Sequence, residues 1–306
     1  MTLPPGAVKN VVVTGGSSGI GRSIVEAFCG ESHRVLFTYL RHAEAAARLV
    51  ERYPTATAVR CDQGDLQSVV ALHDDVARWL DGQPLDVLVN NAALGSQTVL
   101  TYENLRDNDA REHLDAGSRG AHIQQLLSKA CRDEALMRVN ALGPLWVSDA
   151  LIPLMSGPNR AVVVMVGSVG GSSGAVFPEY HPSDLMSKAA VAYLTQHLAA
   201  DLIRSHVDVV CVSPGATDTD MMRASMTNKE LAMPMTRGML AKGRLIDPRE
   251  IADVIYWICT QAQARVFHGA VLDASMGLAC RPGLQTERPS YSANNGSPTR
   301  TSGSET

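Results

Sequence analysis

The sequence predicts an α/β fold in which a doubly wound sheet of seven parallel strands carries helices on both faces. Three observations support this prediction. Short apolar runs alternate with helical patterns from residue 10 to about residue 280. The runs are continuous in hydrophobicity and rich in valine, which is typical of parallel strands that are buried on both faces. Finally, a glycine-rich turn joins the first run to the first helical pattern.

Each expected strand corresponds to one apolar run. A chain of 306 residues is longer than most single domains, yet one α/β domain can fill it. There is neither an internal repeat nor a second pattern of alternation, so we expect a single domain over residues 8–280. The seven expected strands cover residues 11–14, 34–39, 57–61, 87–90, 161–167, 207–212 and 270–272.

Two segments depart from this alternation. Residues 95–134 form a long polar insertion after the fourth expected strand, although Ile123, Leu126, Leu127 and Ala130 follow a helical pattern within it. We interpret the insertion as a solvated face, with an interface or a lid over the substrate as the alternatives. Residues 281–306 are rich in Ser, Pro, Gly, Asn and Thr and are expected to form a disordered tail.

Composition excludes several classes of protein. Hydrophobic residues make up 45% of the chain and charged residues 19%, and the net charge of −4 comes without a basic run, so neither nucleic acid nor a membrane is an expected partner. No apolar stretch reaches the ~18 residues of a membrane span, and the amino terminus lacks the pattern of a signal peptide. We therefore expect a cytoplasmic protein with buried free thiols and no metal site. The cysteines are Cys29, Cys61, Cys131, Cys211, Cys259 and Cys280.

The glycine-rich turn, Thr-Gly-Gly-Ser-Ser-Gly-Ile-Gly at residues 14–21, indicates a Rossmann-like dinucleotide-binding domain. Gly15 permits a tight turn, Gly19 lets the backbone approach a pyrophosphate, and Gly21 lets the helix pack close to the sheet. The helix amino terminus adds free N–H groups and a positive dipole. A glycine turn that only ends a strand is the structural alternative. The residues expected at the phosphates are Gly15, Ser17, Ser18, Gly19, Ile20 and Gly21.

The end of the second expected strand favours NADP(H) over NAD(H). A carboxylate at this point would accept a hydrogen bond from the adenosine ribose and select NAD(H), but the sequence there is Leu40-Arg41-His42. Arg41, helped by Arg22 and His42, is expected to bind a 2′-phosphate. A surface role for Arg41 is the alternative.

These residues and several further motifs resemble the classical branch of the short-chain dehydrogenase/reductase family over roughly residues 8–278. Residues 14–21 match the family's Thr-Gly-x-x-x-Gly-x-Gly motif, and Asn90-Asn91-Ala92-Ala93 is similar to its Asn-Asn-Ala-Gly motif. The resemblance places Asp62 and Gln63 beside the adenine. It implies further cofactor contacts from Asn91, Ala92, Ala93, Pro214, Gly215, Thr217 and Thr219.

The resemblance also implies a hydride-transfer site with one member missing. Ser168 matches the serine that positions the carbonyl oxygen, and Asn140 matches the asparagine that holds a water in the proton path. Lys188 matches the lysine that holds the nicotinamide ribose and assists a tyrosine four residues earlier. In this chain the earlier position is Asp184, so the family's proton donor is absent from its usual place.

Three residues are candidates for that donor. Asp184 has the correct helical spacing, but a carboxylate beside an ammonium is a poor acid at pH 7, and its structural interpretation is a helix-start acid paired with Lys188. Tyr180 has the correct chemistry from the loop before Pro182, with packing on the wall of the substrate site as the alternative. His181 has the tyrosine-to-lysine spacing of the enoyl-reductase branch and titrates near neutrality, with a helix-cap or surface role as the alternative.

The sequence therefore predicts an NADP(H)-dependent oxidoreductase that reduces a carbonyl or a conjugated double bond of a small organic molecule, in a biosynthetic pathway. One alternative is an inactive dinucleotide-binding scaffold or partner subunit, motivated by Asp184 and the insertion. Another is a non-redox lyase or isomerase that uses the same site. The resemblance implies a homodimer or homotetramer.

Overall fold

The computed structural model describes residues 8–99, 102, 121–172, 180–225 and 241–278. Helix α5 (Ala121–Met137) contains the helical pattern expected in the insertion and confirms it. Most of the remaining insertion, and the tail at 281–306, lie outside the described residues.

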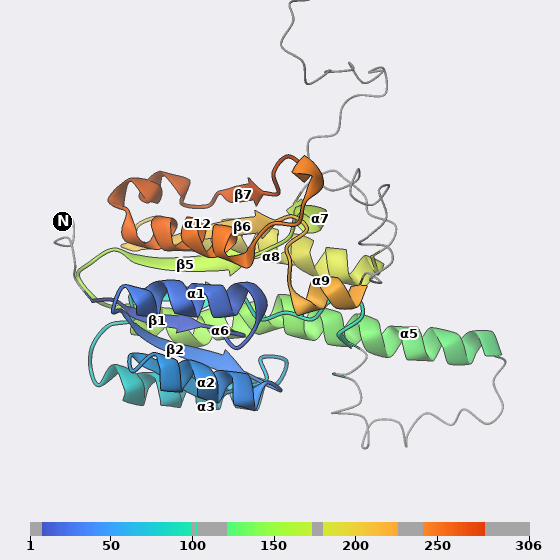
Figure 1. The fold of residues 1–306 in the computed structure, drawn as a ribbon, viewed down its shortest axis with the longest axis horizontal. Helices are drawn as coiled ribbons and strands as arrows, with labels where there is room; N and C mark the ends of the chain where they lie inside the picture. The colour runs from blue at the N-terminus through green and yellow to red at the C-terminus, as the bar shows by residue number, and fades with distance from the viewer. Residues whose placement is uncertain (1–7, 100–101, 103–120, 173–179, 226–240, 279–306) are drawn as a thin grey trace, which may run out of the picture.

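The seven expected strands are confirmed, and all of them run parallel (Figure 1). The sheet order is β3-β2-β1-β4-β5-β6-β7, so the chain reverses its direction of winding between β1 and β4, where α/β sheets bind ligands. The strands are β1 (Asn10–Val13), β2 (Arg34–Tyr39), β3 (Ala56–Arg60), β4 (Val87–Asn90), β5 (Ala161–Val166), β6 (Val207–Pro214) and β7 (Val271–Ala274).

Helices cover both faces of the sheet because consecutive strand residues point to opposite sides. Val11 and Val13 face α1 (Gly19–Gly30), α2 (Ala43–Arg52) and α12 (Pro248–Thr260) in one buried cluster. Val12 and Leu88 face a second cluster, which contains residues of three other helices. These are α3 (Leu66–Leu80), α6 (Gly143–Leu151) and α8 (Pro182–Asp201).

Three elements shape the carboxyl edge of the sheet. Helix α5 projects beyond the ends of the strands and continues through a π-helical segment, Arg138–Leu142, into α6 (Figure 1). Helix α7 (Val169–Ser172) follows β5, and α9 (Asp220–Ser225) follows β6. Short 3-10 segments complete the fold at Ile152–Leu154, Ala241–Gly243 and Ala262–Phe267.

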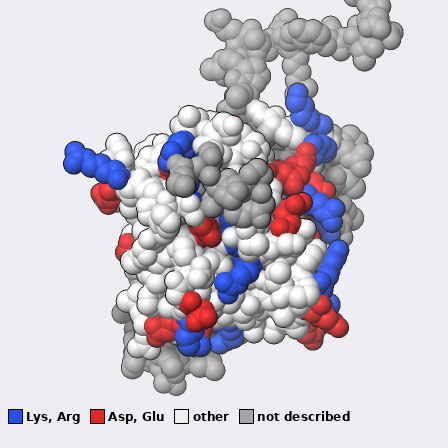
Figure 2. Space-filling model, turned by 90° about the vertical axis from the view of Figure 1, so that its left-hand side faces the viewer, with Lys and Arg blue, Asp and Glu red and all other residues white. Residues whose placement is uncertain are grey.

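The opposite edge has a mixed charge. Figure 2 shows basic and acidic side chains interspersed over this face, without a large patch of one sign. Among the described helices, none is both long and apolar enough to cross a membrane. Cys29, Cys61, Cys211 and Cys259 are buried free thiols as expected, whereas Cys131 on α5 is exposed, which corrects the expectation for that residue.

Candidate active site

The glycine turn after β1 is closed by contacts that require glycine. Gly15 has a positive φ of 67°, and its N–H donates to Thr38 Oγ1 at 3.0 Å. A Cβ on Gly15 would lie 2.8 Å from Ala92 Cα, and a Cβ on Gly21 would overlap the Gly15 carbonyl oxygen and the Asn91 amide. The turn therefore brings α1 directly against the ends of β1 and β4.

The amino terminus of α1 is suited to an anion. Ser18 is its N-cap, and the first turn carries no acidic residue. Gly19 has a φ of 52°, and a Cβ there would lie 3.1 Å from Thr219 Cγ2, so the segment after β6 borders the turn. Ser17 is buried and Ile20 is half-buried against the core. Backbone N–H groups and the helix dipole are what bind a pyrophosphate at such a place.

The end of β4 forms the floor between the two halves of the crevice. Thr14 Oγ1 accepts hydrogen bonds from Asn91 N and Ala92 N, both at 3.0 Å. In return, Asn91 Nδ2 donates to the carbonyls of Thr14 and Gly15. Ala93 follows directly in the chain. Asn91 therefore holds the glycine turn against the end of β4. Both N–H groups of its side-chain amide are used in these two hydrogen bonds.

Arg41 is exposed at the end of β2, where a phosphate on the adenosine ribose would be accessible. The helpers expected for it differ in their placement. His42 is exposed at the N-cap of α2. Arg22 donates from Nε to Glu26 Oε1 at 3.0 Å within α1, and its role as a helper stays a prediction.

Asp62 and Gln63, at the end of β3, have different surroundings. Both carboxylate oxygens of Asp62 accept from the hydroxyl of Tyr102 at 3.1 Å, and Oδ1 also accepts from Gly64 N. Gln63 is buried, and its Nε2 donates to the carbonyls of Ala92 and Val139. Asp62 is half-buried after β3, whereas Gln63 holds the segment after β4 and the π-helical segment together.

The segment after β6 borders the other half of the crevice. Pro214 ends the strand, and a Cβ on Gly215 would lie 2.9 Å from Ser275 Cα. Thr217 Oγ1 donates to the Gly215 carbonyl at 3.0 Å, and Thr219 Oγ1 accepts from Met222 N at 3.2 Å. These bonds fold the segment into a compact turn that leads into α9.

Ser168 lies at the carboxyl end of β5, and its Oγ accepts from Gly170 N at 3.2 Å. The short helix α7 begins here and packs closely on α8. A Cβ on Gly171 would lie 2.5 Å from Lys188 C and 2.5 Å from Ala189 N. This approach sets the distance between the serine segment and the lysine segment.

Lys188 points back toward β5, where its Nζ donates to the carbonyl of Val166 at 3.4 Å. Burial lowers the pKa of its ammonium, because the charged form loses hydration. The charges of Asp184 and Cys211 oppose that shift. The side chain of Lys188 thus ends at β5, the strand that Ser168 directly follows in the chain.

Asp184 is buried, with 7% of its surface exposed, in the first turn of α8. Its Oδ2 accepts from Ser96 N and from Ser96 Oγ, both at 2.9 Å. Among the residues that the structure describes, no ion pair within 4.0 Å joins Asp184 to Lys188, so the expected pairing is replaced by the contact with Ser96.

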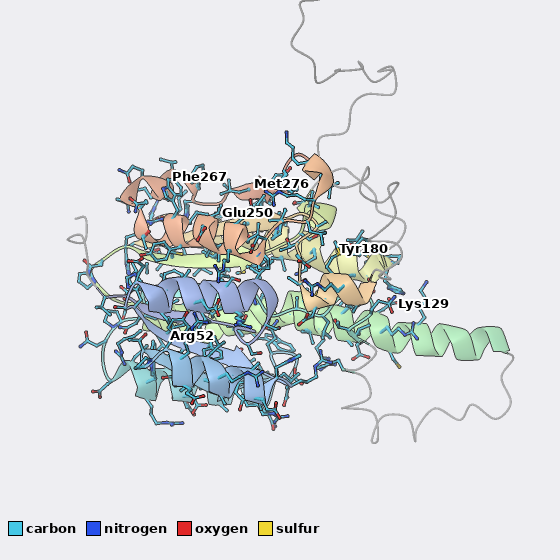
Figure 3. The ribbon with its side chains drawn as sticks, in the orientation of Figure 1. Arg52, Lys129, Tyr180, Glu250, Phe267 and Met276 are labelled. Carbon is cyan, nitrogen blue, oxygen red and sulfur yellow. The ribbon has the colours of Figure 1, made fainter. Side chains whose placement is uncertain are left out.

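Tyr180 and His181 precede α8 and point to different neighbours. Tyr180 lies outside the helix, as expected, and its hydroxyl donates to Met222 Sδ of α9 at 3.6 Å. His181 stands at the N-cap position of α8, although its side chain makes no capping hydrogen bond. Its Nδ1 lies 2.7 Å from Ser183 Oγ and 3.2 Å from Asp133 Oδ1 of α5. Figure 3 places Tyr180 at the end of the molecule where the strands end.

Asn140 lies in the π-helical segment, which is buried at this point. Its Oδ1 accepts from Leu94 N at 2.7 Å, and its Nδ2 donates to Leu94 O and Ser187 Oγ. The side-chain amide is therefore used to join the segment after β4 to α8. The role of Asn140 in holding a water in the proton path stays a prediction.

Four residues with a part in this arrangement were missed by the sequence analysis: Ser96, Tyr102, Asp133 and Gly171. No local pattern links Ser96 to Asp184, which lies 88 positions away. The pair Gly170-Gly171, which Ser168 and Val169 separate from the expected strand at 161–167, is a usable signal, since glycine near a strand end often marks close backbone approach.

A family model of short chain dehydrogenases matches residues 9–230 of this chain. The galactitol 2-dehydrogenase of Rhizobium johnstonii is 27% identical over 89% of this chain and 95% of its own length. The oxidoreductase YmfI of Bacillus subtilis is 26% identical over 89% of this chain and 99% of its own length.

Solved structures give the same result. The structure of BdcA in complex with NADPH is 26% identical, with a TM-score of 0.64 over 87% of this chain and 93% of that chain. The Pseudomonas aeruginosa RhlG/NADP complex is similar in fold, with a TM-score of 0.69 at 23% identity over 91% of this chain and 98% of that chain. The chain therefore belongs to the short chain dehydrogenase family of NAD(P)-dependent oxidoreductases.

Proposed function

We propose that this protein is an NADP(H)-dependent reductase that converts a carbonyl group of a small organic molecule to an alcohol, with a conjugated double bond as the second class of acceptor. The observation that carries the proposal is the turn of Gly15, Gly19 and Gly21, in which every added Cβ would meet a neighbour within 3.1 Å. Glycine at these three positions lets the turn close tightly and leaves the backbone N–H groups at the start of α1 accessible to a pyrophosphate.

The preference for NADP(H) rests on Arg41 and on the absence of a carboxylate at the end of β2. Arg41 is exposed there, and a guanidinium binds a 2′-phosphate through paired hydrogen bonds. The relative BdcA, whose structure contains NADPH, supports the same choice.

The bound cofactor supplies a hydride from the nicotinamide to the carbonyl carbon. Ser168 donates a hydrogen bond to the carbonyl oxygen, and Lys188 holds the ribose hydroxyls with its ammonium. The oxygen then needs one proton to become a hydroxyl. Asp184 is not our choice for the donor, because one oxygen of its carboxylate is already engaged by two hydrogen bonds from Ser96.

Tyr180 is our choice for the proton donor. Its hydroxyl reaches Met222 of α9, whose neighbour Met221 packs on Gly95, where a Cβ would lie 2.9 Å from Met221 Cγ. The phenol is therefore directed toward the element that borders the crevice. The imidazole of His181 is instead engaged through Nδ1 with Ser183 and with Asp133 of α5.

The same residues suggest an apolar substrate. Met221 is 36% exposed, and both methionines belong to α9, which borders the glycine turn through Thr219. Methionine side chains adapt their shape to irregular apolar ligands. We infer a ketone or enone with a sizeable hydrocarbon part rather than a sugar.

An inactive dinucleotide-binding scaffold is the alternative, motivated by the hydrogen bonds that engage Asp184 with Ser96; the comparisons do not favour it. The second alternative, a non-redox lyase or isomerase, uses the same residues without hydride transfer.

We also propose a homodimer or homotetramer and a cytoplasmic location. Met186 and Tyr193 on α8, which are 60% and 69% exposed, are suited to an interface between subunits.

The test combines binding with isotope transfer. The purified protein is titrated with NADPH and NADH by calorimetry, and NADPH with deuterium at C4 is then supplied with a panel of ketones and enones. A reductase transfers the label to product carbon, and Tyr180→Phe lowers turnover by about 10²–10⁴-fold while cofactor affinity is retained. Binding without transfer supports the scaffold, unlabelled product supports a lyase or isomerase, and no binding of either cofactor refutes the proposal.

A further inference from the structure

We propose that Tyr102 is a positioning residue that fixes the carboxylate of Asp62 for the 6-amino group of the cofactor's adenine. The inference rests on the proposed function, because it concerns the adenosine end of the same crevice. It adds a residue from the 95–134 segment to the determinants of cofactor specificity.

The contact between the two residues is symmetrical. The hydroxyl of Tyr102 donates to Oδ1 and to Oδ2 of Asp62, at 3.1 Å in both cases. Such a bifurcated bond fixes the plane of the carboxylate, which otherwise rotates freely about its terminal torsion. Gly64 N adds a further bond to Oδ1 at 2.9 Å.

Tyr102 is itself held rigidly. Only 2% of its surface is exposed, and a Cβ on Gly64 would lie 2.6 Å from its hydroxyl oxygen, so the phenol fits closely over the turn after β3. Its ring belongs to a small apolar cluster, separate from the two clusters that line the sheet. The other members of this cluster are Leu94, Val99, Leu136 and Val139, with Leu40 and Ala135 at its border.

The carboxylate retains capacity for a ligand. A carboxylate oxygen can accept two hydrogen bonds. Oδ1 accepts from Tyr102 and Gly64, whereas Oδ2 accepts only from Tyr102 among the residues that the structure describes. Asp62 is half-buried, so Oδ2 is within reach of a group that enters the crevice.

The position of Asp62 in the fold identifies the ligand group that would donate a hydrogen bond to its Oδ2. A dinucleotide on this sheet has its pyrophosphate at α1 and its adenosine half toward β2 and β3, because it lies across the carboxyl ends of the strands. Asp62 follows β3 on that side, and Arg41 follows β2. The exocyclic amine of adenine is the hydrogen-bond donor of the purine. A fixed carboxylate acceptor there selects adenine over a purine that carries oxygen at the same position.

The experiment compares NADPH with its reduced hypoxanthine analogue, in which oxygen replaces the 6-amino group. Dissociation constants are measured by cofactor fluorescence for the full-length protein and for Tyr102→Phe, which keeps the ring and removes the hydroxyl. We expect the wild-type protein to bind NADPH more tightly than the analogue. In Tyr102→Phe the dissociation constant for NADPH should rise about tenfold, whereas that for the analogue should stay the same. Tyr193→Phe, which removes an exposed phenol on α8, is the matched control.

A double-mutant cycle with Asp62→Ala completes the test. That substitution alone should abolish the preference, and adding Tyr102→Phe should change nothing further. Equal losses for the two cofactors, an unchanged preference, tighter NADPH binding by Tyr102→Phe, or an effect of Tyr102→Phe that persists beside Asp62→Ala would each overturn the inference. A wild-type protein that binds neither dinucleotide would instead refute the proposed function, and the inference with it.

Discussion

Ser96 donates two hydrogen bonds to one oxygen of Asp184, from its backbone N and from its Oγ, each 2.9 Å long. The same Oγ accepts from His181 N at 3.1 Å. One serine after β4 therefore holds the start of α8 at two points. These hydrogen bonds explain how a buried carboxylate is tolerated at position 184.

Removing the hydroxyl of Ser96 should destabilise the fold. In Ser96→Ala, Asp184 keeps the bond from the backbone and loses the bond from the side chain, so the free energy of unfolding should fall by about 2 kcal/mol. Urea unfolding followed by circular dichroism measures the change. The effect should become smaller when Asp184 is also replaced by Ala, because only the bond from His181 N to the hydroxyl is then left to lose. Equal effects in both backgrounds would mean that the hydroxyl does not act through Asp184.

The charge of Asp184 should control Lys188. Burial lowers the pKa of Lys188, and Asp184 raises it, so Asp184→Asn should lower that pKa further. Because the ammonium is the form that holds the ribose, NADPH affinity falls as pH rises through this pKa. In Asp184→Asn the fall should therefore occur at lower pH.

This prediction is measured by NADPH titrations between about pH 6 and about pH 10. Asp201→Asn is the control, since Asp201 is an exposed carboxylate of the same helix that pairs with His197. If the NADPH affinity of the wild type and of Asp184→Asn falls at the same pH, the charge of Asp184 does not control the pKa of Lys188.

The contact between α7 and α8 should not accept a methyl group. In Gly171→Ala, the new Cβ would lie 2.5 Å from the backbone at Lys188 and Ala189, so the helices must separate. We expect a loss of about 1–3 kcal/mol in the free energy of unfolding, together with lower turnover because Ser168 moves with α7. Gly30→Ala is the control, because a Cβ there meets nothing within 4 Å. Equal melting temperatures for the two variants would contradict the prediction.

Arg41 should distinguish the two nicotinamide cofactors. Arg41→Ala removes the cation expected at the 2′-phosphate, so NADPH should bind about tenfold to hundredfold more weakly and NADH should bind as before. The comparison is made by calorimetry, with Arg48→Ala on the exposed face of α2 as the control. Parallel losses for NADPH and NADH would show that Arg41 does not read the phosphate.

The fold was predictable because its information is local. Val-rich runs such as 161–167 contain the strand signal in a few consecutive residues, and the glycine turn at 14–21 identifies the first crossover directly. The confirmed strand β5 ends at Val166, one residue before the expected limit. Pro182 at the first position of α8 likewise marked the start of that helix.

The details of the site were less predictable because they depend on distant contacts. Spacing placed Asp184 one turn before Lys188, which suggested an ion pair, whereas Ser96 of a different element binds the carboxylate first. Asn140 was expected to serve a water, yet the π-helical segment turns its amide toward Leu94 and Ser187. Neither contact has a signature in the surrounding sequence.

The π-helical turn at Arg138–Leu142 has a consequence for the evolution of this chain. One surplus residue there sets the rotational phase of α5 relative to α6 by about 100°, the angle that a single residue contributes to a helix. A one-residue deletion that regularised the turn would swing Asp133 away from His181 and Leu136 away from Tyr102. Recombination with a relative that lacks the extra residue should therefore disrupt both contacts, because the π-helical turn sets the positions of Asp133 and Leu136.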